Sequence, residues 1–515
     1  MSKDLFNDLR FCSYNIPNLD TKYVIGFLVL TGFTGTINET CVYILPKKLK
    51  TCDMFSRGHL IKNVFQRFLV NSIKRCHTHP SRRRPLGNLE RLYYEDRKII
   101  PSMVLLSCQK KVTQSQVNSA LEILVNCHPM LSTDINNVGN NVEFVEKPKV
   151  SIPFQLVEAD DWFPLSRDLY SKFANDKSLW KFIMIQNAHN QKHNLFQFIF
   201  SIHHSLADFP YAHRIIMDFL DILKDLQNGW TNKKYTQYSI PPPIENIQNF
   251  DNPRIETPLK EDVNGITTLE AYEYYYKDEI HSLAESPRIY CGFQYTVLEN
   301  QMVDKYFSKC KTEMVSKNAA IIATLVMSFG KLLEQKGCKD LVKFDFSFMT
   351  NLRRYMGENS TFYPGMAAVG CPLSLTLNLA NIGSLQTVFW DLARNIKHLT
   401  LNALDSRQPL RVIHEDVARW VAEGRKMGKT KSVFVSSNVD KMDGLRPETE
   451  KHFRLEDFQV ISDIQLNHYP IFMVLTHIMN GKLQFGIGYT ANYTSHHTAK
   501  SFCENIRSIV HSISS

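Results

Sequence analysis

Two adjacent histidines, followed four residues later by an aspartate, are the side chains of this chain best suited to proton transfer. They are His203, His204 and Asp208, in the run HHSLAD at residues 203–208. An imidazole at the end of a strand titrates near neutral pH and can take a proton from an alcohol or amine that attacks a carbonyl carbon. Asp208 need not touch that ring, because a carboxylate after a tight turn can instead anchor its loop by pairing with a basic side chain. The run therefore indicates a candidate general base.

Two other interpretations of these residues stay open on spacing alone. The histidines could be hydrogen-bonded core residues, which a lone HxxxD pattern does not exclude. They could also bind a metal together with Asp208. Neighbouring side chains of a strand point to opposite faces, however, and no cluster of histidines or carboxylates stands beside them. The second pair, His496 and His497, is followed by TAKS, which shows that a histidine pair by itself indicates little.

The elements that would position these residues can be recognised from their residue patterns. Residues 195–202, LFQFIFSI, are aromatic or β-branched and predict a buried strand that ends at the two histidines. An apolar helix is predicted after them. Thr113 and Gln116 have the spacing of a capping box and predict the start of a helix that ends at residues 127–129.

The second half of the chain repeats this alternation of strands and helices. A helix is predicted near residues 317–335, and strands at 342–348 and 432–437. Asn480 and Gly481 separate two apolar runs and predict a tight hairpin. The pattern indicates a compact α/β protein whose two halves are divided by a polar segment. The predicted divisions are an extension at 1–55, a basic amphipathic helix and linker at 56–83, a first lobe at 84–225, a crossover at 226–268 and a second lobe at 269–515.

The composition is that of an ordinary folded protein with a mild positive charge. The 515 residues are 43% hydrophobic and 22% charged, with a formal net charge of +9. The basic clusters gather in the first hundred residues and the signs are mixed beyond them, so nucleic-acid binding is disfavoured. The eleven cysteines form no CxxC pair or regular framework. We therefore expect reduced thiols in an intracellular compartment, either cytoplasmic or peripheral on the membrane of the endoplasmic reticulum or a lipid droplet.

The N-terminal region has two features of its own. The apolar stretch at residues 23–37 is short for a membrane span and rich in glycine and threonine, and its β-branched content fits a strand or loop just as easily. It is interpreted first as part of a poorly specified extension, then as a membrane-associating segment, and last as a true span. Residues 56–75 predict an amphipathic helix with a basic polar side and two phenylalanines, Phe65 and Phe68, on the apolar side. That helix could pack on the body of the protein or lie in a membrane interface.

The ordered motifs resemble one protein family. The run HHSLAD after an apolar strand resembles the HHxxxD motif of the CoA-dependent acyltransferase superfamily, which includes chloramphenicol acetyltransferase and peptide-synthetase condensation domains. The chain is most similar to the fungal alcohol acetyltransferases within it. The segments that carry this resemblance, in the family's order, are 84–91, 126–131, 351–353 with Gly365 and Gly370, and 436–439.

This resemblance implies a fold, a reaction and a set of site residues. The implied fold is two-lobed and chloramphenicol-acetyltransferase-like, with a mixed sheet and flanking helices in each lobe and the active-site tunnel between lobes. His204 would be the general base and His203 its structural neighbour, while Asp208 would pair with Arg353 outside the chemistry. Ser437 or Asn438 would donate a hydrogen bond to the oxyanion or to the CoA arm. The implied reaction is transfer of an acetyl or other short acyl group from acyl-CoA to an alcohol, which forms an ester. Acetyl-CoA would be the co-substrate, with no metal and no permanently bound cofactor.

Two departures and two rival functions accompany the resemblance. Phe209 and then Pro210 stand where the family has a glycine, so the turn into the next helix must differ. The DFGWG signature of the plant enzymes is absent, as it is in the fungal family, and no GxSxG elbow indicates a serine hydrolase.

The rival functions are N-acetylation of a long-chain amine such as a sphingoid base and a catalytically silent protein that binds a lipid or partner in the same cleft.

Overall fold

The computed structural model describes residues 23–29, 40–46 and most of the chain from residue 83 onward. The described ranges of this larger part are 83–96, 98–138, 141–165, 178–230, 233–247, 266–284, 291–356, 363–381, 385–423, 432–439, 445–460 and 471–515. Contacts within the chain define two compact units, Met1–Pro80 and Ser81–Ser515.

The first unit contains an antiparallel pair of strands. β1 (Tyr23–Val29) pairs along its whole length with β2 (Thr40–Pro46), so that Tyr23 lies opposite Pro46. The strand that the apolar stretch allowed is thereby confirmed for residues 23–29. The amphipathic helix predicted at 56–75 lies outside the described residues.

A mixed five-stranded sheet forms the first lobe of the second unit. Its strands pair in the order β15-β4-β9-β8-β7. β9 is antiparallel to both neighbours, and its last residue, His203, lies opposite Ile99 of β4. The strands are β15 (Phe453–Val460), β4 (Ile99–Cys108), β9 (Leu195–His203), β8 (Trp180–Gln186) and β7 (Phe154–Glu158).

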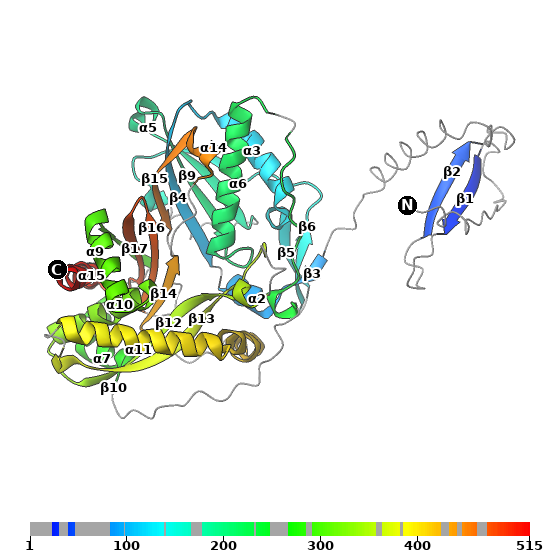
Figure 1. Cartoon of the computed structure of the whole chain (residues 1–515). Coiled ribbons are helices and arrows are strands. Elements are labelled where there is room, and N and C mark those ends of the chain that lie inside the picture. The colour runs from blue at the N-terminus through cyan, green and yellow to red at the C-terminus, as the bar shows by residue number, and fades with distance from the viewer. Residues whose placement is uncertain are drawn as a thin grey trace. The chain divides into compact units, whose positions relative to one another are not determined.

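Two helices cover one face of this sheet because their apolar sides are buried against it. α3 (Gln114–Cys127) and α6 (Phe209–Gln227) share an apolar core with β4, β8 and β9 (Figure 1). The predicted capping box of α3 is confirmed, since the Gln116 N–H donates to Thr113 Oγ1 at 3.3 Å and the Thr113 N–H donates to Gln116 Oε1 at 3.0 Å. The short helices of this lobe are η2 (Pro129–Ser132) and α5 (Ala188–Lys192).

A small three-stranded sheet lies beside the first lobe (Figure 1). Its order is β3-β6-β5, with all pairs antiparallel. The strands are β3 (Arg83–Pro85), β6 (Asn141–Glu146) and β5 (Thr133–Val138). β3 leads directly into α2 (Asn88–Glu95), whose Leu89 and Tyr93 are buried in a separate apolar cluster with residues of the second lobe.

The second lobe contains a seven-stranded mixed sheet. Six of its strands follow the order β10-β12-β14-β16-β17-β11, and the seventh, β13, pairs with β12. Its core also contains α10 and α11, the long helix at the bottom of Figure 1, together with α15. The strands are β10 (Ile266–Thr267), β11 (Cys291–Leu298), β12 (Leu341–Asn351), β13 (Ala368–Asn378), β14 (Phe434–Val439), β16 (Phe472–Met479) and β17 (Lys482–Thr490). The main helices are α7 (Thr268–Tyr275), α8 (Lys277–Ala284), α9 (Asn300–Thr312), α10 (Lys317–Gln335), α11 (Leu385–Asp405) and α15 (His496–Ser514). The short helices are η3 (Ile244–Asn246), η4 (Leu352–Tyr355), η5 (Leu379–Asn381), α12 (Gln408–Arg411), η6 (Val412–Val417), α13 (Ala418–Ala422) and α14 (Pro447–Glu450).

One strand joins the two lobes. β15 lies between β14 and β16 in sequence, yet it pairs with β4 and completes the edge of the first-lobe sheet. The predicted two-lobed α/β architecture is thus present, with the second half of the chain contributing to the first lobe. The hairpin predicted at Asn480 and Gly481 is also confirmed, since both residues have positive φ, 49° and 78°, between β16 and β17. None of the described helices has both the length and the apolar composition needed to cross a bilayer.

Candidate active site

The end of β9 and the turn after it fix the positions of both histidines through the backbone. The His203 N–H donates to the Leu179 carbonyl and the His204 N–H to the Lys98 carbonyl, each at 2.7 Å. The Leu206 N–H donates back to the His203 carbonyl at 2.9 Å and closes a tight turn. Since every one of these bonds is to the backbone, the turn is held independently of any substrate.

The His203 side chain forms its hydrogen bonds within the turn that follows it. Its Nδ1 lies 2.8 Å from Ser205 Oγ and accepts the Ser205 N–H at 3.2 Å. Burial lowers the pKa of His203 to about 3, and the neighbouring His204 adds to the shift. A neutral, hydrogen-bonded imidazole at this position fits the structural role that the family resemblance implies.

His204 is stacked against an aromatic ring. The Tyr93 ring of α2 lies 4.2 Å from the imidazole, measured between centroids, with an interplanar angle of 17°. Burial lowers the pKa of His204 to about 4, and the charge of Lys98 lowers it further. Backbone hydrogen bonding and the negative charge of Asp208 oppose that shift only in part. At neutral pH the imidazole is therefore unprotonated, which is the form that can accept a proton.

Asp208 is fully buried and accepts four hydrogen bonds. Arg353 donates to it from Nη1 at 2.6 Å and from Nη2 at 3.1 Å, and the backbone N–H groups of Tyr211 and Ala367 each donate at 3.1 Å. The predicted pairing of Asp208 with Arg353 is thus confirmed. No described contact brings the carboxylate within hydrogen-bonding distance of His204, so its negative charge is compensated within the turn and by Arg353.

Arg353 also holds the segment that follows it. Its Nε and Nη2 donate to the Tyr363 carbonyl at 3.0 and 2.8 Å, and Nη2 donates to the Gly365 carbonyl at 2.9 Å. A Cβ at Gly365 would lie 2.9 Å from the Tyr363 ring, so the close approach of this segment requires glycine. The guanidinium therefore joins the turn after β9 in the first lobe to the strand and loop of the second.

The departure at Phe209 is accommodated at the first turn of α6. Asp208 is the N-cap, Phe209 the first helical residue and Pro210 the second, where the missing N–H of proline is tolerated. Phe209 is 8% exposed, and its ring centre lies 6.2 Å from that of Phe458 on β15, nearly perpendicular to it, and 6.1 Å from that of His213, nearly parallel to it. An aromatic side chain thus fills the space between α6 and β15 without disturbing the cap.

Ser437 and Asn438 lie on β14, in the sheet of the second lobe. They pair with Leu475 and Thr476 of β16. Asn438 Oδ1 accepts from Ser436 Oγ at 2.9 Å and from Thr476 Oγ1 at 2.6 Å, which leaves the amide N–H groups as the donors. No contact between either residue and His204 is present among the described residues. The structure therefore brings together His203, His204, Asp208 and Arg353, and the oxyanion role of Ser437 or Asn438 stays a prediction.

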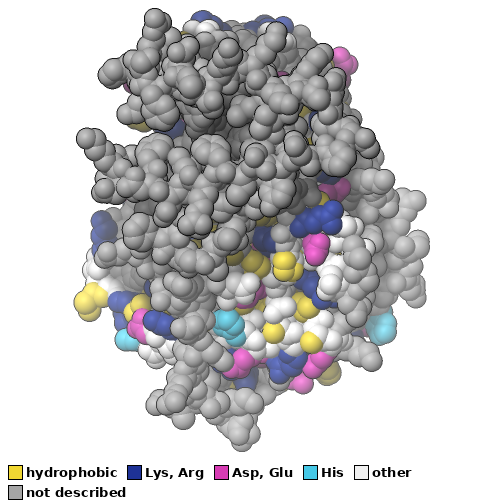
Figure 2. All heavy atoms as spheres, turned by 90° about the vertical axis from the view of Figure 1, so that its right-hand side faces the viewer, with side chains coloured by type: hydrophobic (Ala, Val, Ile, Leu, Met, Phe, Trp, Pro, Cys, Tyr) yellow, Lys and Arg dark blue, Asp and Glu magenta, His cyan; other side chains and the backbone are white. Residues whose placement is uncertain are grey.

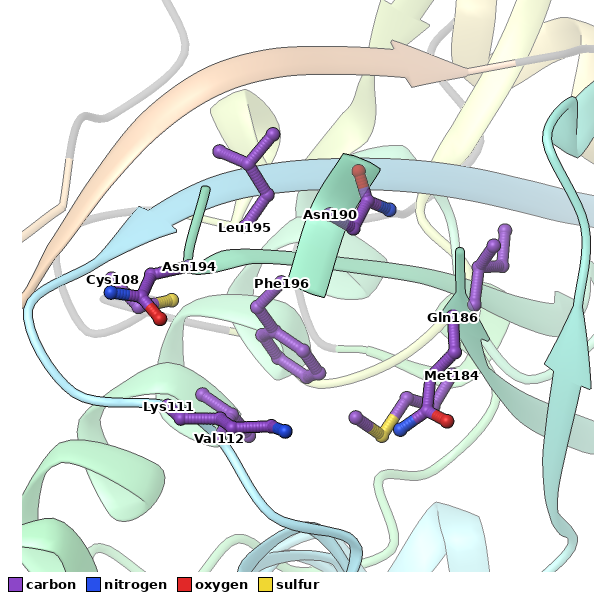
Figure 3. A pocket seen from close by; sticks show the side chains of 10 residues that line it. Cys108, Lys111, Val112, Met184, Gln186, Asn190, Asn194, Leu195 and Phe196 are labelled. Atoms are coloured by element: carbon purple, nitrogen blue, oxygen red, sulfur yellow. The ribbon is translucent and has the colours of Figure 1, made fainter. Parts of the chain in front are cut away.

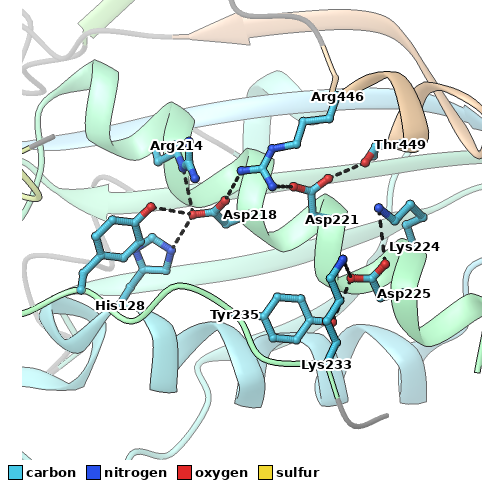
Figure 4. Close-up of polar contacts among 11 residues, drawn as sticks. His128, Arg214, Asp218, Asp221, Lys224, Asp225, Lys233, Tyr235, Arg446 and Thr449 are labelled. Carbon is cyan, nitrogen blue, oxygen red and sulfur yellow. Dashed lines mark hydrogen bonds and ion pairs between the residues drawn. The ribbon is translucent and has the colours of Figure 1, made fainter. Parts of the chain in front are cut away.

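A polar network extends from this site along α6 (Figure 4). Asp218 lies 3.3 Å from His128 Nε2 and accepts from Arg214 at 3.0 Å and from Arg446 at 3.2 Å. Arg446 also pairs with Asp221 at 2.5 Å. The network connects the end of α3, the middle of α6 and the segment that leads into β15, so these elements hold α6 from two sides.

The pocket in Figure 3 is a separate feature. It is lined by residues at the ends of β4, β8 and β9, among them Cys108, Met184 and Phe196. Phe196 lies seven residues before His203 on β9, which places this side of the pocket about 23 Å from the histidines. It therefore lies outside the site built around His204.

The described residues contain no metal cluster, and one face of the molecule carries mixed charges. No group of three or more histidine, cysteine or acidic side chains with metal-binding geometry occurs among them. On the face shown in Figure 2, basic, acidic and hydrophobic side chains are interspersed wherever the residues are coloured.

Solved structures resemble this chain over most of its length. Trichothecene 15-O-acetyltransferase from Fusarium sporotrichioides has a TM-score of 0.64 and 12% identity, covering 84% of this chain and 95% of that protein. Polyketide synthase associated protein 5 from Mycobacterium tuberculosis has a TM-score of 0.53 and 13% identity, covering 84% and 98%. The first condensation domain of the CDA synthetase has a TM-score of 0.56 and 11% identity, covering 84% and 96%. The chain has the condensation-domain acyltransferase fold.

Sequence similarity adds nothing beyond the condensation-domain acyltransferase fold. No protein-family model matches the sequence, and no curated protein matches it. The strand, the motif and Arg353 could be predicted from the sequence, whereas Tyr93, Lys98 and the backbone donor Ala367 were not predicted. The only available signal for Tyr93 was its helical spacing of four residues from Leu89, which marks an apolar helix face without naming what that face contacts.

Proposed function

We propose that this protein transfers an acetyl or other short acyl group from acyl-CoA to an alcohol, with His204 as the general base. The observation that carries the proposal is the neutral, stacked imidazole of His204 beside a turn locked by Asp208 and Arg353. The fold supports it, because one protein that shares the fold is an O-acetyltransferase by name. Membership of the fungal alcohol acetyltransferase family is part of the same proposal.

The proposed reaction is a direct transfer. His204 accepts the hydroxyl proton as the acceptor oxygen bonds to the thioester carbonyl carbon, which places negative charge on the carbonyl oxygen. Collapse of the tetrahedral intermediate breaks the C–S bond, and the imidazolium returns its proton to the CoA thiolate. An amide N–H of Asn438 or the hydroxyl of Ser437 would donate to the oxyanion. The chemistry is balanced without a metal or a covalent acyl-enzyme.

The pH dependence of transfer distinguishes an alcohol acceptor from an amine. A long-chain amine is protonated at neutral pH, with a pKa of roughly 10 by comparison with lysine. It must lose that proton before it can attack, whereas an alcohol is already uncharged at neutral pH. A rate that rises with pH up to about 10 on sphingoid bases, with no transfer to alcohols, would support the N-acetyltransferase instead.

Replacing the base is the first test. We expect His204→Ala to lower the rate of transfer from acetyl-CoA to a medium-chain alcohol by about 10²- to 10⁴-fold, the usual contribution of a general base. His497→Ala is the matched control, since this exposed histidine belongs to the other His-His pair. For the parent enzyme, kcat/KM measured where the fold is intact should not fall near pH 6.5, where an ordinary imidazole becomes protonated, because burial lowers the pKa of His204 to about 4.

Two results would contradict this assignment. Unchanged transfer in His204→Ala would remove His204 from the mechanism. A parent protein that acylates neither alcohols nor amines, yet binds them, would support the silent lipid-binding alternative.

Attachment to the membrane of the endoplasmic reticulum or a lipid droplet through residues 56–75 is proposed separately, and deletion of residues 1–75 would test it by cell fractionation.

A further inference from the structure

Tyr93 lies in direct contact with the candidate base. Its ring and the imidazole of His204 are 4.2 Å apart between centroids and nearly parallel, at 17°. The tyrosine side chain is only 9% exposed and belongs to the apolar cluster that also contains Leu352 and Met366 of the second lobe. The Tyr93 ring is therefore packed against both the His204 imidazole and this apolar cluster.

The helix that carries Tyr93 is fixed at its N-terminus. Glu90 accepts two hydrogen bonds from Arg84, each at 2.7 Å, and one from the Gly87 N–H at 2.9 Å. The Leu89 N–H donates to Glu245 Oε1 at 2.7 Å, which ties the same turn to the segment after α6. Because these charged contacts are buried or partly buried, α2 presents Tyr93 to the imidazole without help from a substrate.

We propose that Tyr93 is a positioning residue for His204: its ring holds the plane of the imidazole and stabilises the positive charge that the imidazole acquires on taking the acceptor's proton. This inference rests on the proposed function. An aromatic face attracts a cation in contact with it, and a neutral imidazole much less. The contact therefore strengthens as the proton is transferred, which lowers the barrier rather than only tightening substrate binding.

The other groups around His204 oppose this stabilisation or supply only part of it. Lys98 carries a positive charge, and its Nζ lies 5.4 Å from the centre of the Tyr93 ring. His203 is held neutral by its turn, and Asp208 is compensated by Arg353. Tyr93 is thus the neutral aromatic group in stacking contact with the ring that must become charged.

Three variants separate this role from a purely structural one. Tyr93→Phe keeps the aromatic face and removes the hydroxyl, Tyr93→Leu removes the face, and Tyr274→Leu makes the same change at a tyrosine that is 66% exposed. We expect Tyr93→Leu to lower kcat by about 2- to 30-fold with little change in KM for either substrate. Tyr93→Phe and Tyr274→Leu should stay within about 2-fold of the parent, since neither removes the stacked face.

A spectroscopic readout makes the result independent of turnover. With ¹³C-labelled histidine, the ring resonances of His204, assigned through their loss in His204→Gln, should be shifted by the ring current of Tyr93. The shift should persist in Tyr93→Phe and disappear in Tyr93→Leu. If Tyr93→Leu does not fold, Tyr93→Met repeats the comparison with a side chain that adapts better to the vacated space.

The outcomes distinguish this inference from the proposed function. Equal losses of kcat in Tyr93→Phe and Tyr93→Leu, or full activity in Tyr93→Leu, would overturn the positioning role while leaving His204 as the base. An absent ring-current shift in the parent would overturn it as well. A parent without transferase activity would refute the proposed function, and with it the charge-stabilising part of this inference, whereas the resonances would still report whether Tyr93 holds the ring.

Discussion

At the scale of single residues, Asp208 and Arg353 show why the aspartate of the motif need not take part in the chemistry. The carboxylate has no exposed surface, and its four donors come from a helix N-terminus, a loop backbone and one guanidinium. With both oxygens engaged by these donors, the carboxylate makes no described hydrogen bond to His204. It therefore acts on His204 through the geometry of the turn and through its negative charge, which opposes part of the shift in the pKa of His204.

Removal of Arg353 tests this arrangement. Arg353→Ala would leave the buried Asp208 without its counter-charge, which should lower the free energy of unfolding by about 3–5 kcal/mol. Guanidinium denaturation followed by circular dichroism measures this. Arg419→Ala, which breaks an ion pair in which Arg419 is 57% exposed, should change stability by less than about 1 kcal/mol. Equal effects of the two substitutions would show that the buried pair has no special role.

The sequence predicted the ion pair of Asp208 with Arg353 but not the stacking of Tyr93 on His204. Asp208 and Arg353 stand in motifs whose order resembles a known family, so their contact could be expected across a wide separation. Tyr93 precedes His204 by a stretch that includes the whole of β4. The pairing of Ile99 with His203 and the hydrogen bond from the His204 N–H to the Lys98 carbonyl bring the two rings together. Such a contact depends on strand register, which periodicity does not reveal.

At the scale of elements, α6 is the helix that positions the site, and it is held along its length. Its N-terminus is capped by Asp208, and its middle is bound to α3 and to the segment before β15 through Asp218 and Asp221 (Figure 4). The family-like segment around His128 thus has a structural explanation, because the buried imidazole contacts both Asp218 and the Tyr211 hydroxyl.

Asp218→Ala should loosen this attachment. It would leave the fully buried His128 without its carboxylate partner, at a cost of about 1–3 kcal/mol in unfolding free energy. We expect a matching loss in the thermal midpoint, with kcat reduced because the N-terminus of α6 carries the motif turn. Asp391→Ala, at a carboxylate that is 67% exposed, should stay within about 0.5 kcal/mol of the parent. If both variants behave alike, the network does not hold the helix.

Elements with strong local signals were predicted correctly, and one strand pairing was not. β9, α10 and the hairpin after Met479 follow from buried apolar runs, a helical period and an Asn-Gly turn. The pairing of β15 with β4 had no local signal, since nothing in the strand itself names its partner. The second lobe therefore reaches into the first in a way that a division of the sequence by composition did not reveal.

At the scale of the whole molecule, buried histidines should make folding sensitive to acid. Burial lowers the pKa of His203 to about 3 and those of His204 and His477 to about 4. In the unfolded chain each would titrate near about 6.5, so below that pH the unfolded state binds protons that the folded state does not. These groups leave stability unchanged above about pH 6.5 and reduce it as the pH falls from there towards about 4.

Thermal unfolding measured between pH 8 and pH 4 tests this expectation. Each of the three histidines should add about 1.4 kcal/mol per pH unit to the loss of stability within that acid window. His477→Gln should make the decline shallower, since one fewer buried imidazole resists protonation. A midpoint that stays constant down to pH 4.5, or a slope unaffected in His477→Gln, would contradict the prediction.

The position of β15 in the chain has a consequence for biosynthesis. A ribosome releases β4 long before β15, because the residue that pairs with Cys108 is Phe453. At about 5–20 residues per second, the emerging chain holds an incomplete first-lobe sheet for roughly 20–70 s, with the backbone of β4 open along one edge. Such an edge is a template for pairing with other chains. Messages truncated before β15 should therefore yield aggregating fragments rather than a separately folded half, and the full-length protein depends on protection of β4 during translation.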